Sequence, residues 1–187
     1  GWGLLNWMQG PAWLEFGFAL VTLDFIIYSQ HQVFHWVPIF WRFHMMHHSD
    51  LDLDVSSGVR FHPVEIVISA MVKGVAVLAL GVAPLAVITF EIVLNGTSLF
   101  NHSNVKIPLS VDPILRWFVV TPDMHRIHHS VDPRETNSNY GFNVPWWDRL
   151  FGTYGAEPAL GQLGMKIGVE HLGSPVCLNL FMMLRLP

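Results

Sequence analysis

The sequence contains a single cysteine, Cys177, which excludes a disulfide framework and any metal cluster held by thiolates. Charged residues are also scarce, at 13% of the chain compared with about 25% in typical globular proteins. The formal net charge of −4 is small and no basic run is long enough to follow a phosphate backbone, so we expect no nucleic-acid partner. No signal-peptide pattern precedes Trp2, and because the chain begins at Gly1 we expect it to lack its true N-terminus.

Hydrophobic and aromatic residues are abundant instead. Hydrophobic residues make up 51% of the chain, which includes 13 phenylalanines and 8 tryptophans, and the mean hydropathy is +0.39. This balance is typical of a membrane protein. At 187 residues the chain has the length of one domain, which we expect to cover residues 1–187.

Two apolar stretches predict membrane helices. Residues 12–30 are long enough to cross a bilayer, and Asp24 within them should face protein or a metal site because an acid facing lipid is costly. The longest apolar run, residues 64–94, is interrupted at residues 81–84, which predicts a helical hairpin that enters and leaves the membrane on one side. With a further helix that opens at Pro38, we expect an all-α integral-membrane bundle with about three membrane helices.

Eight histidines form three tight clusters, and their spacing is the most informative feature of the chain. The clusters are His31-x3-His35, His44-x2-His47-His48 and His125-x2-His128-His129. Positions i, i+3 and i+4 of a helix lie on one face, so we expect each cluster to point its rings toward one spot. Neutral imidazole binds iron, copper, zinc and nickel. Eight imidazoles are too many for one ion, which predicts two bridged metal ions in one site.

Other residues are candidates to complete or orient this site. His102 follows the predicted hairpin on the side of the second cluster, where it either binds metal or caps a helix. His62 either caps the helix that Pro63 opens, supports a ligand or is itself a ligand. Ligating histidines usually donate their second N–H to a carboxylate or carbonyl. The candidate carboxylates, each of which could instead be a helix cap or loop residue, are Asp24, Asp50, Asp123, Asp132 and Asp148.

The second half of the chain carries signals of orientation. Arginines are frequent between Pro108 and Tyr154, where they are Arg116, Arg126, Arg134 and Arg149. Since basic residues accumulate on the cytoplasmic side of membranes, we expect the metal site on that face. Thr121-Pro122 predicts an N-cap and first helical residue before the third cluster. The aromatic run at residues 146–151 predicts an interfacial belt that also covers the site, with Asp148 and Arg149 paired. His171, which lies apart from the clusters, has no expected role.

The motifs resemble those of the fatty acid hydroxylase and sterol desaturase superfamily of integral-membrane di-iron enzymes. The resemblance covers Leu23 to Tyr154 and marks residues 23–154 as a motif-bearing core. It includes the three clusters, R-F-H-P-V-E at residues 60–65, N-H-S-N at 101–104, N-Y-G at 139–141 and W-D-R-L-F-G-T-Y at 147–154. The chain differs at Gln32, where the family often has arginine, and only 30 residues precede His31, where the family usually has further membrane helices.

The resemblance implies O2-dependent hydroxylation or desaturation of an unactivated C–H bond in a fatty acyl, sterol or related lipid. Two non-haem iron ions would carry the reaction, and zinc could replace them in purified protein. Cytochrome b5 or a ferredoxin would supply two electrons, in a bacterial inner membrane or the endoplasmic reticulum. The expected ligands are the eight clustered histidines together with His102. No further catalytic residue is implied.

Three rival interpretations remain. A zinc-dependent membrane hydrolase needs a general base beside the metal, and the clusters contain no H-E-x-x-H. A metal transporter or storage protein would place its ligands in mid-membrane, whereas these clusters lie at the ends of the predicted spans. A bis-histidine haem protein needs only two ligands and leaves most of the clustered histidines unexplained.

Overall fold

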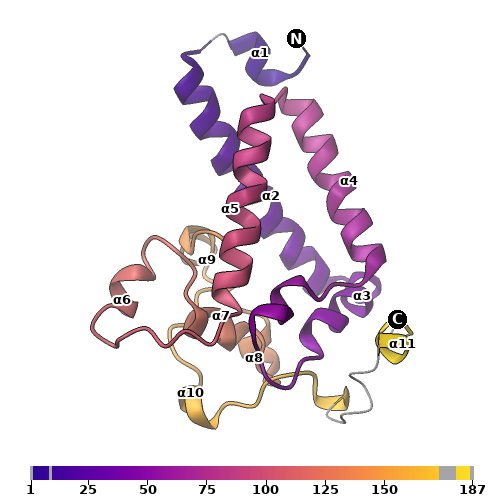
Figure 1. Cartoon of the computed structure of the whole chain (residues 1–187), viewed down its shortest axis with the longest axis vertical. Coiled ribbons are helices and arrows are strands. Elements are labelled where there is room, and N and C mark those ends of the chain that lie inside the picture. Colours follow the sequence, from indigo (N-terminus) through magenta and orange to yellow (C-terminus); the bar gives the residue numbers. More distant parts are fainter. Residues whose placement is uncertain (1, 9, 173–179, 186–187) are drawn as a thin grey trace.

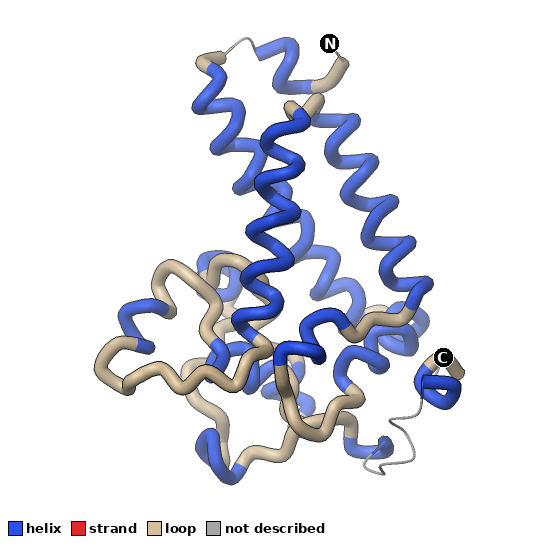
Figure 2. Tube along the Cα trace, viewed as in Figure 1, coloured by secondary structure: helices blue, strands red, loops and turns tan. Residues whose placement is uncertain are grey.

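The computed structural model describes residues 2–8, 10–172 and 180–185. These residues form helices and loops without a β-sheet (Figure 2), and an isolated bridge joins Ser130 to Ile167. The all-α prediction is therefore confirmed for the described part of the chain. Cys177 lies outside the described residues, and so does the side chain of His171.

The helices alternate with loops along the whole chain. In chain order they are α1 (Leu4–Met8), α2 (Ala12–Trp36), α3 (Pro38–His48), the 3-10 helix η1 (Val55–Val59), α4 (Pro63–Leu80), α5 (Pro84–Asn101), α6 (Asp112–Leu115), α7 (Pro122–His128), α8 (Pro133–Thr136), α9 (Trp146–Phe151), α10 (Gly161–Gly164), the 3-10 helix η2 (Glu170–Leu172) and α11 (Leu180–Met183). Three of them, α2, α4 and α5, are long, with 25, 18 and 18 residues.

Helix α2 runs without a break from the first apolar stretch into the first histidine cluster, as predicted. It ends at Trp36 because Val37 precedes a proline, and the residue before a proline is disfavoured in the helical conformation. Pro38 then opens α3, whose last turn carries His47 and His48. Helices α2 and α3 together therefore present the first two clusters to one region.

Helices α4 and α5 form the predicted hairpin. Gly81 ends α4 with a φ of 70°, a left-handed conformation that glycine adopts without strain, and Pro84 opens α5. The two helices diverge from this turn, and Figure 1 shows them as the arms of a V with α2 crossing behind. The hairpin thus places its two open ends beside the short helices α3 and α7.

Two helices of the described residues, α2 and α4, are long and apolar enough to cross a membrane. Helix α5 is as long as α4, but its second half contains Asn95, Thr97, Ser98 and Asn101. Two of the three predicted membrane helices therefore meet the test of length and hydropathy. Only 6% of the apolar window of α4 is buried inside the molecule, so most of its apolar surface is free to face lipid.

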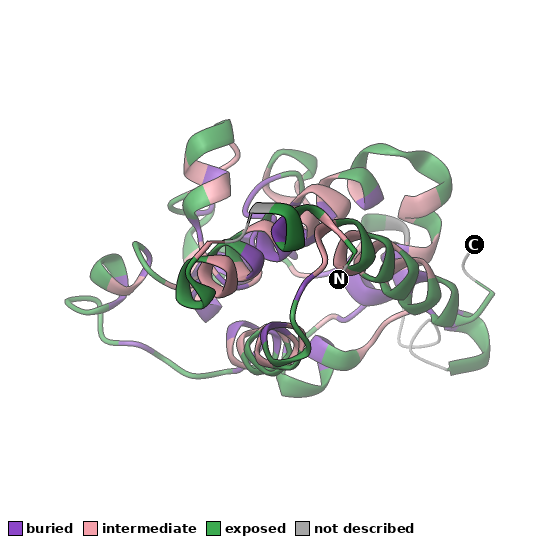
Figure 3. Ribbon diagram, turned by 90° about the horizontal axis from the view of Figure 1, so that it is seen from above, coloured by how far each residue is buried: buried purple, intermediate pink, exposed green. Residues whose placement is uncertain are grey.

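Apart from α1, which lies beside the turn at Gly81, the short helices form a second layer at the open end of the hairpin. The apolar core lies between α1, α2 and α5 and contains Leu5, Ala19, Leu23, Ile27, Val82, Ala86 and Phe90. In the view of Figure 3, buried residues lie toward the middle of the molecule and exposed residues surround them. Most of the clustered histidines are fully buried. They lie where the long helices meet the short ones.

Candidate metal centre

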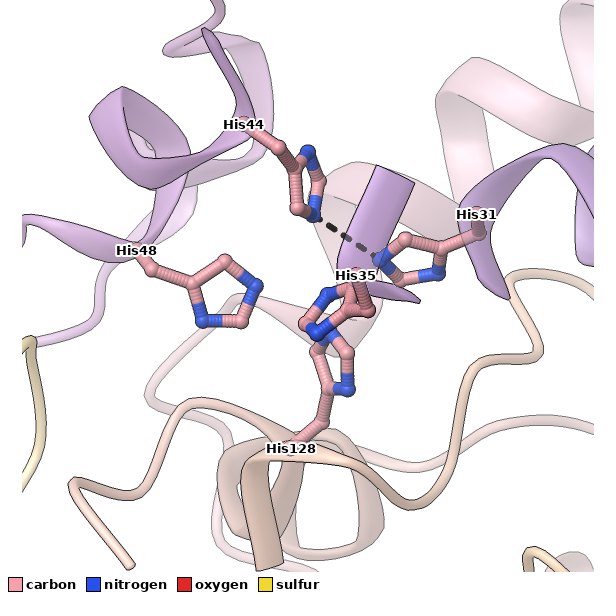
Figure 4. Close-up of side chains that lie close together, drawn as sticks. All are labelled: His31, His35, His44, His48 and His128. Carbon is pink, nitrogen blue, oxygen red and sulfur yellow. Dashed lines mark hydrogen bonds between the residues drawn. The ribbon is translucent and has the colours of Figure 1, made fainter. Parts of the chain in front are cut away.

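Nine histidines converge on one region at the end of the long helices, where they form two groups. The first group contains His31, His35, His44, His48 and His128, and the second contains His47, His102, His125 and His129. Within each group, nitrogen atoms that could bind metal lie within 4.8 Å of one another. Figure 4 shows the rings of the first group pointing toward one another from separate parts of the chain. The structure thus brings together all nine histidines that the sequence predicts as ligands.

The two H-x-x-H-H clusters each contribute to both groups. The i and i+4 histidines of one cluster share a group, and the i+3 histidine joins the other group. The first group thus receives His44, His48 and His128, and the second receives His125, His129 and His47. Successive residues turn by about 100° around a helix, so positions i+3 and i+4 lie on opposite sides of position i. The prediction that each cluster points toward one spot is therefore confirmed for His31 and His35, which share the first group, and wrong for the two H-x-x-H-H clusters.

The separations of the ring nitrogens fit metal ligands. His31 Nε2 lies 3.0 Å from His44 Nε2, and His102 Nε2 lies 3.1 Å from His47 Nε2. His102 Nε2 also lies 3.2 Å from the Nε2 atoms of His125 and His129. Two nitrogens held at about 2.1 Å from one ion would be about 3.0 Å apart at a right angle and about 3.4 Å apart at the tetrahedral angle. Each short separation therefore fits two ligands of one ion.

Several ring nitrogens of the first group are buried without a hydrogen-bond partner among the described residues. They are His35 Nε2, His48 Nε2 and His128 Nε2. Buried polar atoms in native proteins are nearly always paired, and a metal ion would use these lone pairs. A donor set made only of imidazole suits iron, copper, nickel or zinc and does not suit magnesium or calcium. The residues present therefore fit one transition-metal ion in each group.

Burial favours the neutral form of six imidazoles outside the long helices. It lowers the pKa well below the ordinary value for His47, His48, His125 and His129, and the neighbouring histidines lower it further. Burial also lowers the pKa of His128 to about 3 and the pKa of His102 to about 4. A neutral ring offers one nitrogen lone pair, which is the form that binds metal.

Backbone carbonyl groups orient several of the rings. The Nδ1–H groups of His31, His102 and His128 each donate to a carbonyl oxygen at 2.7 Å. The accepting residues are Tyr140, Ser98 and Ser138, respectively. Because Nδ1 carries the proton in each ring, the lone pair lies on Nε2. The carbonyl groups thus turn the Nε2 atoms toward the centre of each group.

Glu65 orients a fourth ring, and the sequence analysis did not identify it. Its Oε1 accepts a hydrogen bond from His44 Nδ1 at 2.7 Å, and the residue is only 5% exposed. Glu65 lies in the first turn of α4, where an acid is also explained by the positive end of the helix dipole. Its position in the first turn of a largely apolar helix, three residues after His62, was the signal that could have found it.

Four of the five predicted aspartates have other partners, and none of the five bonds to a clustered histidine in the described part of the chain, so the prediction that they orient ligands is wrong. Trp147 Nε1 donates to Asp24 Oδ2 at 2.6 Å, which does confirm that Asp24 faces protein. The remaining aspartates serve the loops and short helices. Asp50 forms an ion pair with Arg60, and Asp132 forms one with Arg134, each at 3.0 Å. Asp123 lies in the first turn of α7. Asp148 accepts hydrogen bonds from the backbone N–H groups of Tyr140 and Gly141.

Asp148 and Arg149 do not pair, although the sequence predicts that they do. Asp148 is fully buried, and burial raises its pKa to about 6. Arg149 instead stacks its guanidinium group on the rings of Trp117 and Tyr154, at 4.0 and 3.9 Å from their centroids. Asp148 therefore holds the chain segment whose Tyr140 carbonyl orients His31, and Arg149 stabilises the surface around α9.

His62 and Thr121 are both N-cap residues, which for Thr121 is the predicted position and for His62 is one of its three predicted alternatives. His62 lies outside both groups, and its Nδ1 accepts a hydrogen bond from the Val64 N–H at 3.2 Å, so it caps α4 rather than binding metal. His102 combines its two predicted roles, because it is the C-cap residue of α5 and its ring belongs to the second group. Thr121 is the N-cap residue of α7, but its side chain makes no capping hydrogen bond.

Two cavities reach the first group from different sides. A cavity of about 380 Å³ lies between α2, α4 and α5 and has His31 and His44 in its wall. A second cavity, of about 270 Å³, lies between α3 and α8 and reaches His35. Phe34 also lines the larger of these two cavities. The first group is therefore accessible both from the long helices and from the loop side.

Comparisons with known proteins give consistent results. The family model described as fatty acid hydroxylase matches residues 16–153. The chain is 34% identical over 151 residues to an ornithine lipid hydroxylase from Rhizobium tropici. This match covers 80% of this chain and 44% of the relative. It is 31% identical over 146 residues to an alkylglycerol monooxygenase from Xenopus tropicalis, and this match covers 76% of this chain and 30% of the relative. It is also 31% identical over 183 residues to a fatty acid hydroxylase from a Lecanicillium species, a match that covers 88% of this chain and 50% of the relative.

The chain spans half or less of the length of these curated relatives. No solved structure matches it significantly. The family match nevertheless includes the first two histidine clusters, the hairpin, His102 and the third cluster. The chain therefore belongs to the fatty acid hydroxylase family.

Proposed function

We propose that this chain is the catalytic domain of a membrane-bound di-iron oxygenase, which uses O2 and two external electrons to hydroxylate or desaturate an unactivated C–H bond of a lipid. The observation that carries the proposal is the division of nine histidines into two adjacent groups. Two groups of neutral nitrogen donors suit two redox-active ions. The lipid hydroxylases and monooxygenases among the relatives support the lipid substrate and the type of reaction.

In this proposal the five histidines of the first group hold one iron ion and the four of the second group hold the other. When bound, the iron pair would supply the electrons that activate O2 for C–H cleavage. Backbone carbonyl groups fix the orientation of the His31, His102 and His128 rings, and Glu65 fixes that of His44. The negative charge of Glu65 also offsets part of the charge that two metal cations bring into a buried site.

The proposal places α2 and the hairpin in a membrane, with the histidines at the cytoplasmic face. Exposed tryptophans lie near both ends of α2, where Trp13 is 74% and Trp36 is 63% exposed. Their separation of 23 residues corresponds to about 34 Å along a helix, close to the roughly 30 Å of a hydrocarbon core. Trp2 and Trp7, which are also exposed, lie near Gly81, because Asn6 between them donates to the Gly81 carbonyl. Tryptophan at both levels is typical of the two membrane interfaces.

The remaining parts of the proposal follow from the resemblance. Residues 1–187 would act as a single membrane domain around the core at 23–154. Its electron donor would be cytochrome b5 or a ferredoxin, which would approach the cytoplasmic face of a bacterial inner membrane or the endoplasmic reticulum.

Metal analysis and isotope labelling test the proposal. The full-length protein is purified anaerobically, its metal is quantified, and a Mössbauer spectrum is recorded. It is then reconstituted with host membrane lipids, a chemical reductant and 18O2. We expect paired iron and either an 18O-labelled lipid or an alkene whose formation requires O2. A single iron site, or a lipid conversion that proceeds without O2, would overturn the proposal.

A further inference from the structure

An ion pair lies in the middle of the α4–α5 hairpin, and the metal centre does not use it. Lys73 Nζ lies 2.5 Å from Glu91 Oε1. Lys73 is seven residues from the end of α4 and Glu91 is seven residues from the start of α5, so both lie at the same distance from the turn. Charged residues inside membrane helices are costly and usually mark a substrate or ion pathway. This pair therefore calls for a functional explanation.

The ion pair lines the same cavity as His31 and His44. Three helices contribute a stripe with the spacing i, i+3, i+4 and i+7, which is one face of a helix. The stripes are Ile27, Gln30, His31 and Phe34 of α2, Ile66, Ser69, Ala70 and Lys73 of α4, and Glu91, Leu94, Asn95 and Ser98 of α5. Three helical faces thus converge on one elongated space of about 380 Å³, within the roughly 300–1,000 Å³ of small-molecule sites.

The cavity has two distinct ends. His44 and its partner Glu65 lie at one end, and Lys73 and Glu91 lie at the other. Glu65 and Lys73 are eight residues apart on α4, which corresponds to about 12 Å along the helix. An extended chain of single bonds advances about 1.2 Å per bond, as the backbone of an extended polypeptide does, so about ten bonds fit between the two ends.

The cavity lies between α2, α4 and α5, and the last two helices diverge from the turn at Gly81 (Figure 1). The side chains of Lys73 and Glu91 bridge these two helices. The outer face of α4 is apolar and exposed at Val67, Met71 and Val75, as expected of a surface covered by lipid. A lipid chain could therefore move from the bilayer into the cavity without crossing water.

We infer that this cavity holds the hydrocarbon chain of a membrane lipid, and that the Lys73–Glu91 bridge is its end wall and limits how far the chain extends beyond the histidines. The inference rests on the proposed function for the choice of a lipid, but chain binding itself needs neither metal nor O2. Carbons near the head group lie beside His31 and His44, and carbons about ten bonds further along lie beside the bridge. A charged pair excludes further methylene groups because an apolar chain cannot satisfy it.

Photo-crosslinking in lipid nanodiscs tests this inference. The full-length protein is mixed with palmitic acid that carries a diazirine either near its carboxyl group or near its terminal methyl group, and labelled peptides are mapped by mass spectrometry. We expect the first probe to label peptides that contain His31 or His44, and the second to label the stripes near Lys73 and Glu91. Labelling confined to outward residues such as Met71 would overturn the inference. Because no turnover is required, failure of the oxygenase proposal would leave this result unchanged.

Three variants sharpen the test. Ala70→Phe fills the cavity and should lose labelling, whereas Met71→Phe, on the outward side of the same turn, should keep it. The double variant Lys73→Ala/Glu91→Ala opens the end wall and should shift the terminal label toward the turn at residues 81–83. The charge-swapped variant Lys73→Glu/Glu91→Lys should return the label to its original position. Equal labelling of all these variants would show that neither the cavity nor the bridge contacts the chain.

Discussion

Replacement of Glu65 tests how the second layer of the metal centre works. Glu65→Gln keeps an oxygen acceptor for His44 Nδ1–H but removes the charge, and the added N–H2 group takes the place of the unpaired Oε2. A hydrogen bond to a charged group contributes about 1.5–3 kcal/mol and a neutral one about 1 kcal/mol, so metal binding should weaken by about 1 kcal/mol. Glu65→Ala leaves Nδ1–H buried without an acceptor, and the expected loss of about 2 kcal/mol is a factor of about 30 in affinity.

Chelator competition measures this loss directly. The two variants and the unaltered full-length protein are loaded with iron, titrated with a chelator, and compared by the concentration that removes half of the metal. Glu157→Gln makes the same chemical change at an exposed position and should behave like the unaltered protein. Retention of metal by Glu65→Ala at the unaltered level would refute the argument, because His44 would then need no acceptor to act as a ligand.

Three further substitutions test other parts of the structure. His128→Ala should lower metal content and abolish turnover, because it removes a ligand of the first group. His62→Ala removes the cap of α4 and should retain its metal. Metal analysis of the purified variants distinguishes the two results. Asp148→Ala removes the acceptor of two buried backbone N–H groups and of the Thr153 hydroxyl. Each unpaired group lowers the free energy of unfolding by about 1–3 kcal/mol, so thermal unfolding in detergent should begin at a clearly lower temperature. Trp147→Phe leaves the Asp24 carboxylate without its indole partner, so the yield of folded protein should fall, and combining it with Asp24→Leu should restore the yield.

The long helices could be predicted from sequence because their ends carry strong local signals. Prolines open α3, α4, α5 and α7, and Gly81 ends α4 in the left-handed conformation. These signals act within a few residues and do not depend on tertiary packing. The helical pattern of the eight clustered histidines was equally local, and His102 could be named because it follows the predicted hairpin.

The partners of the histidines could not be predicted in the same way. The sequence analysis searched for carboxylates close to the clusters along the chain, but Glu65 is 21 residues from His44 and reaches it from a different helix. The other ring acceptors are backbone carbonyl groups, which every residue possesses and which no sequence pattern marks. Only the packing of α4 and the loop after α8 against the clusters decides which groups come within hydrogen-bond distance.

The repeated H-x-x-H-H spacing gains a physical meaning from the two groups. A helix that lies beside two adjacent sites can serve both only if its ligands point to two sides, and positions i+3 and i+4 do so because they diverge by about 100°. In α3 the pair His44 and His48 serves the first group, whereas at α7 the pair His125 and His129 serves the second. Helix α3 therefore contributes two histidines to the first group and its i+3 histidine, His47, to the second group. Helix α7 and its C-cap do the reverse, with the i+3 histidine His128 in the first group. Such an exchange couples the sites, because loss of either helix would remove ligands from both.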